Sequence, residues 1–431
     1  MLSRHKVAVV GAVVCTFTAA GCGVGEGSGD STTAAQQSVS APAKLAGTIT
    51  FQTWSLKNDK FTPYFTQLIA AFEKSHAGTK INWIDQPGDG YADKVASQIK
   101  SGSLPDVVNL PPEIAYQATR PGALLNLAKS VPTLSTDYVA SGIGAYTYPG
   151  VDGSYAFPWY LGTDVNYWNK DILGKAGVST TALPTTNDQL MAAAKKVHDA
   201  TGGRDYLISR KPGLLDFVAA GVPLSSADGK KFAFNTPAAA GVVDKYVSAY
   251  KSGYMPKDAL SDTYLGNSAL FEKSRVGWTT GTGFFIKDLQ GKSPTLAPKV
   301  IGSPVIGTPP LYAQGISVAA KSKNLPLALE FAKFATNNTN QLAFTDIATG
   351  FLPGTTAAQT DPRFSKSDGT AAGNAAVLAA KALPQAKVIQ PPTWTEAMST
   401  YLNQQLALAL TGKQSSKDAL DKAVSKANSL L

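Results

Sequence analysis

Aromatic, amide and carboxylate side chains stand at the ends of three short apolar stretches. "GTITFQTWS" ends on Trp54 and Ser55, "TKINWIDQ" ends on Asp85 and Gln86, and "LPDVVNLPP" carries Asn109. Flat aromatic faces can cover the CH groups of a sugar ring, and planar polar groups can bond its vicinal hydroxyls. These residue types therefore fit the binding of a neutral, hydroxyl-rich small molecule.

Catalytic and metal-binding constellations find little support in the same sequence. Of the three histidines, His5 lies in the first residues, His76 at a predicted helix end and His198 in a polar helical context. They assemble neither a Ser-His-Asp set nor a metal cluster. The glycine-rich "GVGEGSG" follows no strand and so is no phosphate loop. We expect no enzyme activity, no catalytic residue, no metal and no cofactor.

Alternating strand and helix patterns would position the polar residues. Ile49 and Phe51 share one face of an extended stretch, and Phe65, Leu68 and Phe72 follow at helical spacing. A second strand, a helix over residues 91–101 and a short apolar strand come next. This alternation predicts an α/β layer with a largely parallel sheet, whose strand ends would carry the site.

The later sequence predicts a second body. "SYAFPWYLGTDVNYWNKDIL" opens as a strand, meets Pro158 and continues as another extended piece into a helix near Asp171. A proline between two extended pieces indicates a crossing between bodies. Further elements are helices over 188–201 and 325–334, strands in "RVGWTTG" and "QGISVAA", and an amphipathic final helix. The length of the chain likewise predicts two or three domains.

The first residues have the layout of a secretory signal, with a basic start and an apolar run that ends in small residues. Residues 1–21 are expected to be this signal peptide. Cys22, which follows, resembles the acylated cysteine of bacterial lipoproteins, whose lipid includes acyl chains such as palmitate. Residues 22–45 are rich in Gly, Ser, Thr and Ala and predict a flexible, lipid-anchored tether. We expect an extracytoplasmic protein anchored to the cell membrane by a lipid on Cys22.

The formal net charge of +9 invites comparison with nucleic-acid-binding proteins. The lysines, however, stand singly or in pairs, and no arginine-rich stripe or basic motif with interleaved aromatics is present. A solvated surface is the better interpretation, and we expect no nucleic-acid partner.

A series of segments resembles the extracellular solute-binding proteins of ATP-driven importers, in the maltodextrin-binding-like group that serves sugars. The segments are, in order, "ITFQTW", "LIAAFEKSHAGTKINW", "DGYADKVASQIKSGSLPDVVNL", "AFPWY", "NYWNKDILGKAGV", "ALFEKSRVGWTTG" and "GISVAAKSKNLPLALEFAKFATNNTNQLAF". The resemblance implies a monomer with a two-lobed periplasmic-binding-protein-like fold (type II) and hinge crossings between lobes. One lobe would take residues 46–157 plus 312–357, and the other 160–309 plus 360–431.

The resemblance also implies a function and a set of residues. The chain would capture a mono- or oligosaccharide in the cleft between lobes and deliver it to the transmembrane permease subunits of an ABC importer. A surface-anchored glycoside hydrolase stays open as the alternative. Besides the five strand-end residues named above, the cleft would be lined by Trp159, Tyr160, Asp164, Trp278, Gly281, Phe284 and Gln314.

Overall fold

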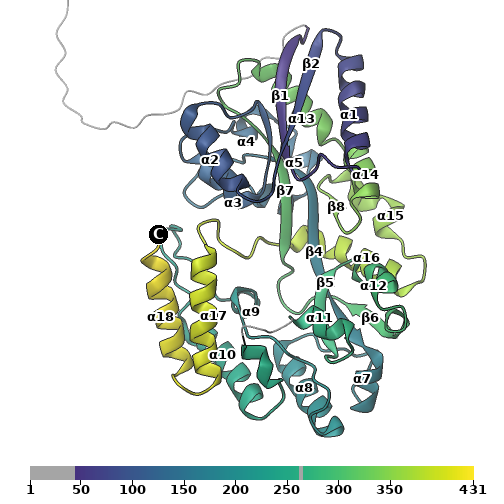
Figure 1. The fold of residues 1–431 in the computed structure, drawn as a ribbon, viewed down its shortest axis with the longest axis vertical. Helices are drawn as coiled ribbons and strands as arrows, with labels where there is room; N and C mark the ends of the chain where they lie inside the picture. The colour runs from purple at the N-terminus through teal and green to yellow at the C-terminus, as the bar shows by residue number, and fades with distance from the viewer. Residues whose placement is uncertain (1–43, 262–265) are drawn as a thin grey trace, which may run out of the picture. The chain divides into compact units, whose positions relative to one another are not determined.

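The computed structural model describes residues 44–261 and 266–431 (Figure 1). The chain divides into residues 1–37 and 38–431, and every described residue belongs to the second unit. The signal peptide, Cys22 and nearly all of the expected tether therefore lie outside the described residues. Within the described ranges, no helix has the length and apolar character needed to cross a membrane.

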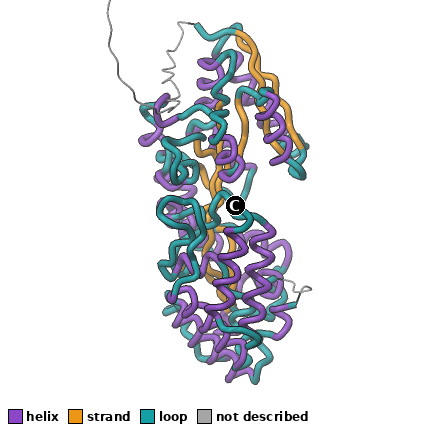
Figure 2. The backbone as a smooth tube through the Cα atoms, turned by 90° about the vertical axis from the view of Figure 1, so that its left-hand side faces the viewer, coloured by secondary structure: helices purple, strands orange, loops and turns teal. Residues whose placement is uncertain are grey.

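One mixed sheet organises the described residues. The strands lie in the order β2-β1-β3-β7-β4-β5, and β6 and β8 pair with β4 off this path. Their bounds are β1 Gly47–Trp54, β2 Thr79–Gln86, β3 Val107–Leu110, β4 Phe157–Asn169, β5 Trp278–Thr282, β6 Val300–Ser303, β7 Leu311–Val318 and β8 Leu352–Pro353. In Figure 2 the helices gather around these strands, which are drawn in orange.

The expectation of a largely parallel sheet holds for β1, β2 and β3 and is wrong for the rest of the sheet. Only the pairs of β1 with β2 and β3 are parallel, whereas β7 runs antiparallel to both β3 and β4, and β4 runs antiparallel to β5, β6 and β8. Local alternation of strand and helix predicted the first three strands correctly. It carried no information about β7, which comes from far along the chain and inserts between β3 and β4.

The long strand β4 also differs from its expected form. The sequence predicted a strand before Pro158 and a second piece after it, but residues 157–169 form one strand that begins just before the proline. Its pairing register with β7 shifts between Pro158 and Tyr160. A proline is tolerated here because it sits at the start of the strand, where a missing N–H disrupts the ladder least.

Helices account for most of the remaining described residues, and the helices expected over 91–101, 188–201 and 325–334 are confirmed. The α-helices are α1 Thr62–Ser75, α2 Tyr91–Ser101, α3 Pro112–Thr119, α4 Leu127–Ser130, α5 Leu134–Asp137, α6 Ala140–Gly144, α7 Lys170–Lys175, α8 Asn187–Thr201, α9 Leu214–Ala219, α10 Pro237–Lys251, α11 Asn267–Glu272, α12 Phe285–Lys292, α13 Leu325–Ala335, α14 Asn338–Ile347, α15 Pro362–Ser365, α16 Ala371–Ala382, α17 Glu396–Leu410 and α18 Ser416–Asn428. Short 3₁₀ turns are η1 Lys257–Leu260, η2 Ala297–Lys299, η3 Ala357–Thr360 and η4 Leu383–Gln385.

Separate cores lie at the two ends of the sheet. One draws only on residues 49–159 and 316–348, where β1, α1 and α13 pack their apolar faces together. Another draws only on residues 168–427, chiefly from α8, α10, α17 and α18. A third core combines residues from the sequence ranges of the other two, from Tyr91 to Ala386, and surrounds the middle of β4. The strands β4 and β7 thus join two groups of helices, each with its own core.

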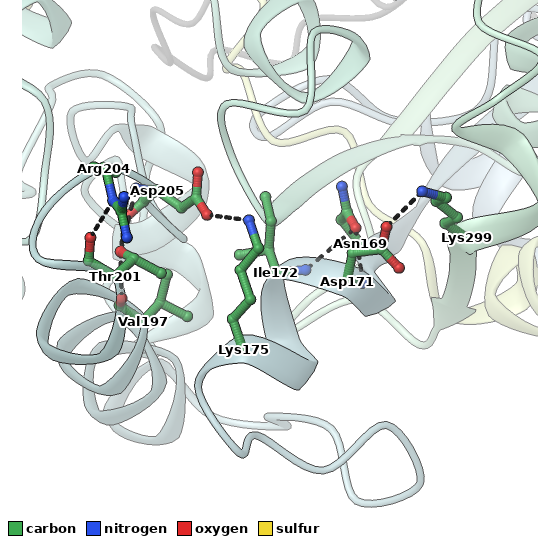
Figure 3. Close-up of polar contacts among 9 residues, drawn as sticks. All are labelled: Asn169, Asp171, Ile172, Lys175, Val197, Thr201, Arg204, Asp205 and Lys299. Carbon is green, nitrogen blue, oxygen red and sulfur yellow. Dashed lines mark hydrogen bonds and ion pairs between the residues drawn. The ribbon is translucent and has the colours of Figure 1, made fainter.

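Polar contacts fix the exit from β4 into the following helices (Figure 3). Asn169 ends the strand, and its Oδ1 accepts from the backbone N–H groups of Asp171 and Ile172 as the N-cap of α7. These two bonds satisfy backbone N–H groups that have no partner within the first turn of the helix. Exposed ion pairs join Asp171 to Lys299 and Lys175 to Asp205, at 2.6 and 2.8 Å.

Candidate functional site

A cavity of about 690 Å³ is bounded by residues from both groups of helices. This volume lies within the range of roughly 300–1,000 Å³ that is typical of small-molecule sites. Its aromatic lining residues are Trp54, Tyr160, Tyr312, Phe351 and Trp394. Its polar lining residues are Glu113, Gln314, Gln390, Ser399 and Asn403. The cavity therefore combines apolar faces with amide groups.

Three of the residues predicted from the sequence line this cavity: Trp54, Tyr160 and Gln314. Trp54 ends β1 and stacks on Tyr91, with ring centroids 5.7 Å apart, and its indole N–H is buried without a hydrogen-bond partner among the described residues. Tyr160 lies on β4 opposite Gln314 of β7 and packs against Phe351. Tyr160 and Gln314 lie within their strands, and the pairing of β4 with β7 brings them together.

Asn109 and Asp164 lie just behind the cavity wall and do not line it. Asn109 is fully buried, and its Nδ2 donates to Gln314 Oε1 at 3.1 Å. Asp164 is 8% exposed and accepts a hydrogen bond from the hydroxyl of Tyr312 at 3.2 Å. Each of these residues therefore contacts a side chain that does face the cavity.

The structure places two predicted tryptophans in the cores. Trp159 is 1% exposed and packs against Phe65 and Phe344. Trp278 is 2% exposed, and its indole N–H donates to Oδ1 of Asn166 at 3.1 Å. Neither lines the cavity, in keeping with the common use of tryptophan as a packing residue.

The other predicted residues lie at the strand ends but outside the cavity lining. Ser55 is exposed at φ 55°, and Gln86 ends β2. Asp85 accepts from Thr53 Oγ1 at 2.6 Å and from the backbone N–H of Leu56 and of Lys57, so its carboxylate organises the loop after β1.

Two more predicted residues also lie outside the cavity lining. Gly281 lies within β5, where it pairs with Val165 of β4. Phe284 is half-buried and precedes α12. None of Ser55, Asp85, Gln86, Gly281 and Phe284 lines the cavity.

Several of the residues that line the cavity were not predicted from the sequence. Tyr312 alternates with Gln314 on β7 and is 50% exposed, which makes it the most open aromatic ring of the cavity. Residues 388–391 reach the cavity because the backbone of Lys387 bonds with Pro309 and Leu311. Nothing in the local sequence marks such a long-range contact. The pair Pro111-Pro112 after β3 was a usable signal, because ligands bind beyond the carboxyl ends of strands.

Glu113 is the one charged side chain among the residues that line the cavity. It stands exposed in the first turn of α3, and partial loss of hydration raises the pKa of its carboxyl above the ordinary value. None of the described residues that line the cavity is a lysine or an arginine, so the positive net charge of the chain does not extend to this wall. The arrangement suits an uncharged ligand with hydroxyl or amide groups better than an anion.

Asp164 gives a pH-dependent prediction. Burial raises the pKa of this carboxyl, against the lowering effect of hydrogen bonds from Tyr312 and Thr280. The folded protein therefore holds the proton more tightly than the unfolded chain, and the stability contributed by this group falls as the pH rises from about 3.9 through the folded-state pKa. We expect Asp164→Asn to raise the melting temperature more at pH 7 than at pH 4.

Differential scanning fluorimetry of the parent and the variant across this range checks the prediction. The substitution Asp171→Asn, which removes an exposed carboxylate, serves as the control. An equal shift for Asp164→Asn at both pH values would contradict the proposed cost of the buried charge.

Among residues 44–261 and 266–431, no group of three or more His, Cys, Asp or Glu side chains is arranged to hold a metal ion.

Comparisons with known proteins agree with this geometry. The family pattern described as "Bacterial extracellular solute-binding protein" matches residues 58–342. The diacetylchitobiose binding protein DasA of Streptomyces coelicolor is 24% identical over 393 residues, which cover 88% of this chain and 87% of DasA. YcjN of Escherichia coli, a proposed ABC transporter periplasmic-binding protein, is 32% identical over 147 residues, or 31% of each chain.

A solved structure shows the same fold. The crystal structure of a proposed oligosaccharide periplasmic-binding protein from Synechococcus sp. MITs9220 superposes with a TM-score of 0.76 and 26% identity, and covers 88% of this chain and 98% of its own. The relatives named here are binding proteins, so the hydrolase alternative gains no support from them. The chain belongs to the family of bacterial extracellular solute-binding proteins and has their two-lobed, type II α/β fold.

Proposed function

We propose that the chain captures a neutral carbohydrate in the cavity between its lobes and delivers it to the transmembrane permease subunits of an ABC importer. The observation that carries the sugar assignment is the cavity wall itself, where five aromatic rings face four uncharged polar side chains and a single carboxylate. DasA, named for diacetylchitobiose, and YcjN, named as an ABC transporter protein, support the two parts of the proposal.

Isothermal titration with the purified protein tests this function. The panel contains N,N′-diacetylchitobiose, cellobiose, maltotriose and maltotetraose, with glucose 1-phosphate and glutamate as charged controls. We expect at least one neutral sugar to bind more tightly than millimolar and both anions to bind less tightly. Binding of an anion alone, or of no sugar, would contradict the proposal. Unchanged sugars recovered by mass spectrometry would separate binding from hydrolysis.

The proposed lobes keep the limits expected from the sequence, residues 46–157 plus 312–357 and residues 160–309 plus 360–431. The core built only from residues 49–159 and 316–348 supports the first lobe, and the core built only from residues 168–427 supports the second. Closure of such lobes about β4 and β7 would trap the ligand, to the extent that the ligand binds the closed form more tightly.

The membrane anchor is a separate part of the proposal. Cys22 would carry the lipid and hold a monomeric protein on the outer side of the cell membrane, with residues 22–45 as the tether. We expect the full-length chain, expressed in a bacterial host that processes lipoproteins, to enter the detergent phase of a Triton X-114 partition, and Cys22→Ser to move to the aqueous phase or the medium. Cys15→Ser is the matched control. Equal partition of both variants would contradict the anchor.

A further inference from the structure

Four residues of β7 line the cavity, Leu311, Tyr312, Ala313 and Gln314, and the side chains among them that carry polar groups are Tyr312 and Gln314. Residues two apart on a strand point to the same face, so this pair forms one continuous piece of the wall. Each of the two side chains is bonded to a buried residue of a neighbouring strand, Gln314 to Asn109 of β3 and Tyr312 to Asp164 of β4. The wall is thus held from both sides by groups that do not face the cavity themselves.

The orientation of the Gln314 amide follows from its contacts. Nδ2 of Asn109 lies 3.2 Å from the backbone carbonyl oxygen of Gly315, which can only accept a hydrogen bond, so the nitrogen of Asn109 must face it. The same nitrogen lies 3.1 Å from Gln314, whose amide must therefore offer its oxygen. The other branch of that amide, the NH₂ group, is left for the cavity.

Tyr312 is held in a comparable way. Its hydroxyl donates to the buried Asp164 carboxylate, which in its ionised form has no proton to donate and can only accept. Tyr312 lies directly across from Gly162 of β4, and a Cβ at Gly162 would stand 3.7 Å from Cδ2 of the tyrosine. That separation is an ordinary van der Waals contact, so the ring packs over Gly162 while its hydroxyl reaches Asp164.

We propose that Asn109 and Asp164 are positioning residues that fix what β7 offers to the ligand: an N–H donor from Gln314 and the face of the Tyr312 ring. This inference rests on the proposed sugar-binding function and deepens it. The ligand must present an acceptor oxygen to Gln314, such as a hydroxyl, a ring oxygen or an N-acetyl carbonyl, beside an apolar CH face that covers Tyr312.

Two double-mutant cycles test this arrangement, with the tightest-binding sugar of the panel above as the titrant. Asn109→Ala should weaken Kd about 10-fold in the parent, the equivalent of one lost hydrogen bond, and should have almost no effect in a Gln314→Ala background. Asp164→Ala should behave in the same way toward Tyr312→Phe. Asp164→Asn keeps an acceptor for the tyrosine hydroxyl and should recover most of the affinity lost in Asp164→Ala.

The substitution Gln314→Glu tests whether the ligand needs a hydrogen-bond donor at this position, because it replaces the donor by an acceptor in a side chain of the same shape. One oxygen can still accept from Asn109, whereas the group facing the cavity changes from a donor to an acceptor, so Kd should weaken by about 10-fold or more. Gln390→Glu is the matched control, because the same charge is added to another amide of the cavity. An equal loss for both changes would mean that added charge, not donor position, matters.

The outcomes separate the two proposals. Additive effects in both cycles would overturn the positioning role while leaving sugar binding intact. A parent protein that binds no sugar would contradict the proposed function. In that event crystal structures of Asn109→Ala and Asp164→Ala still decide the positioning: an amide of Gln314 and a ring of Tyr312 that keep their parent orientations would overturn it, and displaced groups would support it.

Discussion

Tyr312→Ala is expected to weaken sugar binding by roughly 5–30-fold, which corresponds to about 1–2 kcal/mol for a lost aromatic face and its buried area. The ring is half exposed in the cavity although its hydroxyl is already bonded to Asp164, so the face is the part left to a ligand. Ring faces of this kind pack on the CH groups of a sugar without any cost for burying a polar group. The loss should therefore appear as a faster dissociation rate.

Two comparisons make this result specific. Tyr312→Phe keeps the ring but loses the bond to Asp164, so it should weaken binding by about as much as Asp164→Ala and by no more than Tyr312→Ala. Tyr155→Ala removes a partly buried tyrosine that does not line the cavity and should leave Kd unchanged. Titration calorimetry and stopped-flow fluorescence supply the two measurements. If Tyr312→Ala and Tyr155→Ala bind alike, the open ring is not a ligand platform.

The sequence predicted the elements around this site better than it predicted the site. The bounds of β2 and α2 follow from residue periodicity, and the match extends to their end residues. Periodicity is a local property, so it is preserved wherever the strand or helix ends up in the fold. It contains no information on strand partners, and the antiparallel insertion of β7 between β3 and β4 could not be read from it.

The same limit explains which site residues were found. Trp54 was identified because it ends an apolar stretch and Gln314 through the family resemblance, and both line the cavity. Asp85 has the same kind of position, yet its carboxylate is occupied by backbone N–H groups of the following loop. Side-chain direction and competing partners decide between these cases, and both depend on atoms that lie far apart in the chain.

An ion pair next to the cavity should have a large effect on stability, because its carboxylate is buried although the Arg210 side chain is 28% exposed. The Asp216 carboxylate, 3% exposed, accepts two bonds from the Arg210 guanidinium at 2.6 and 2.8 Å. It also accepts from the backbone N–H of Gly213 and from the hydroxyl of Tyr246. These contacts hold the first turn of α9, and residues 213–215 line the cavity. The pair therefore links the core of one lobe to the binding wall.

Arg210→Ala is expected to lower the free energy of unfolding by about 3–5 kcal/mol, because it leaves a desolvated carboxylate without its cation. Lys299→Ala removes an ion pair of similar length in which both side chains are about half exposed, and should cost under about 1 kcal/mol. Urea denaturation monitored by tryptophan fluorescence compares the two. Asp216→Asn combined with Arg210→Ala removes the stranded charge and should recover part of the loss. Equal destabilisation by Arg210→Ala and Lys299→Ala would mean that water reaches Asp216 and that the pair does not support the cavity wall.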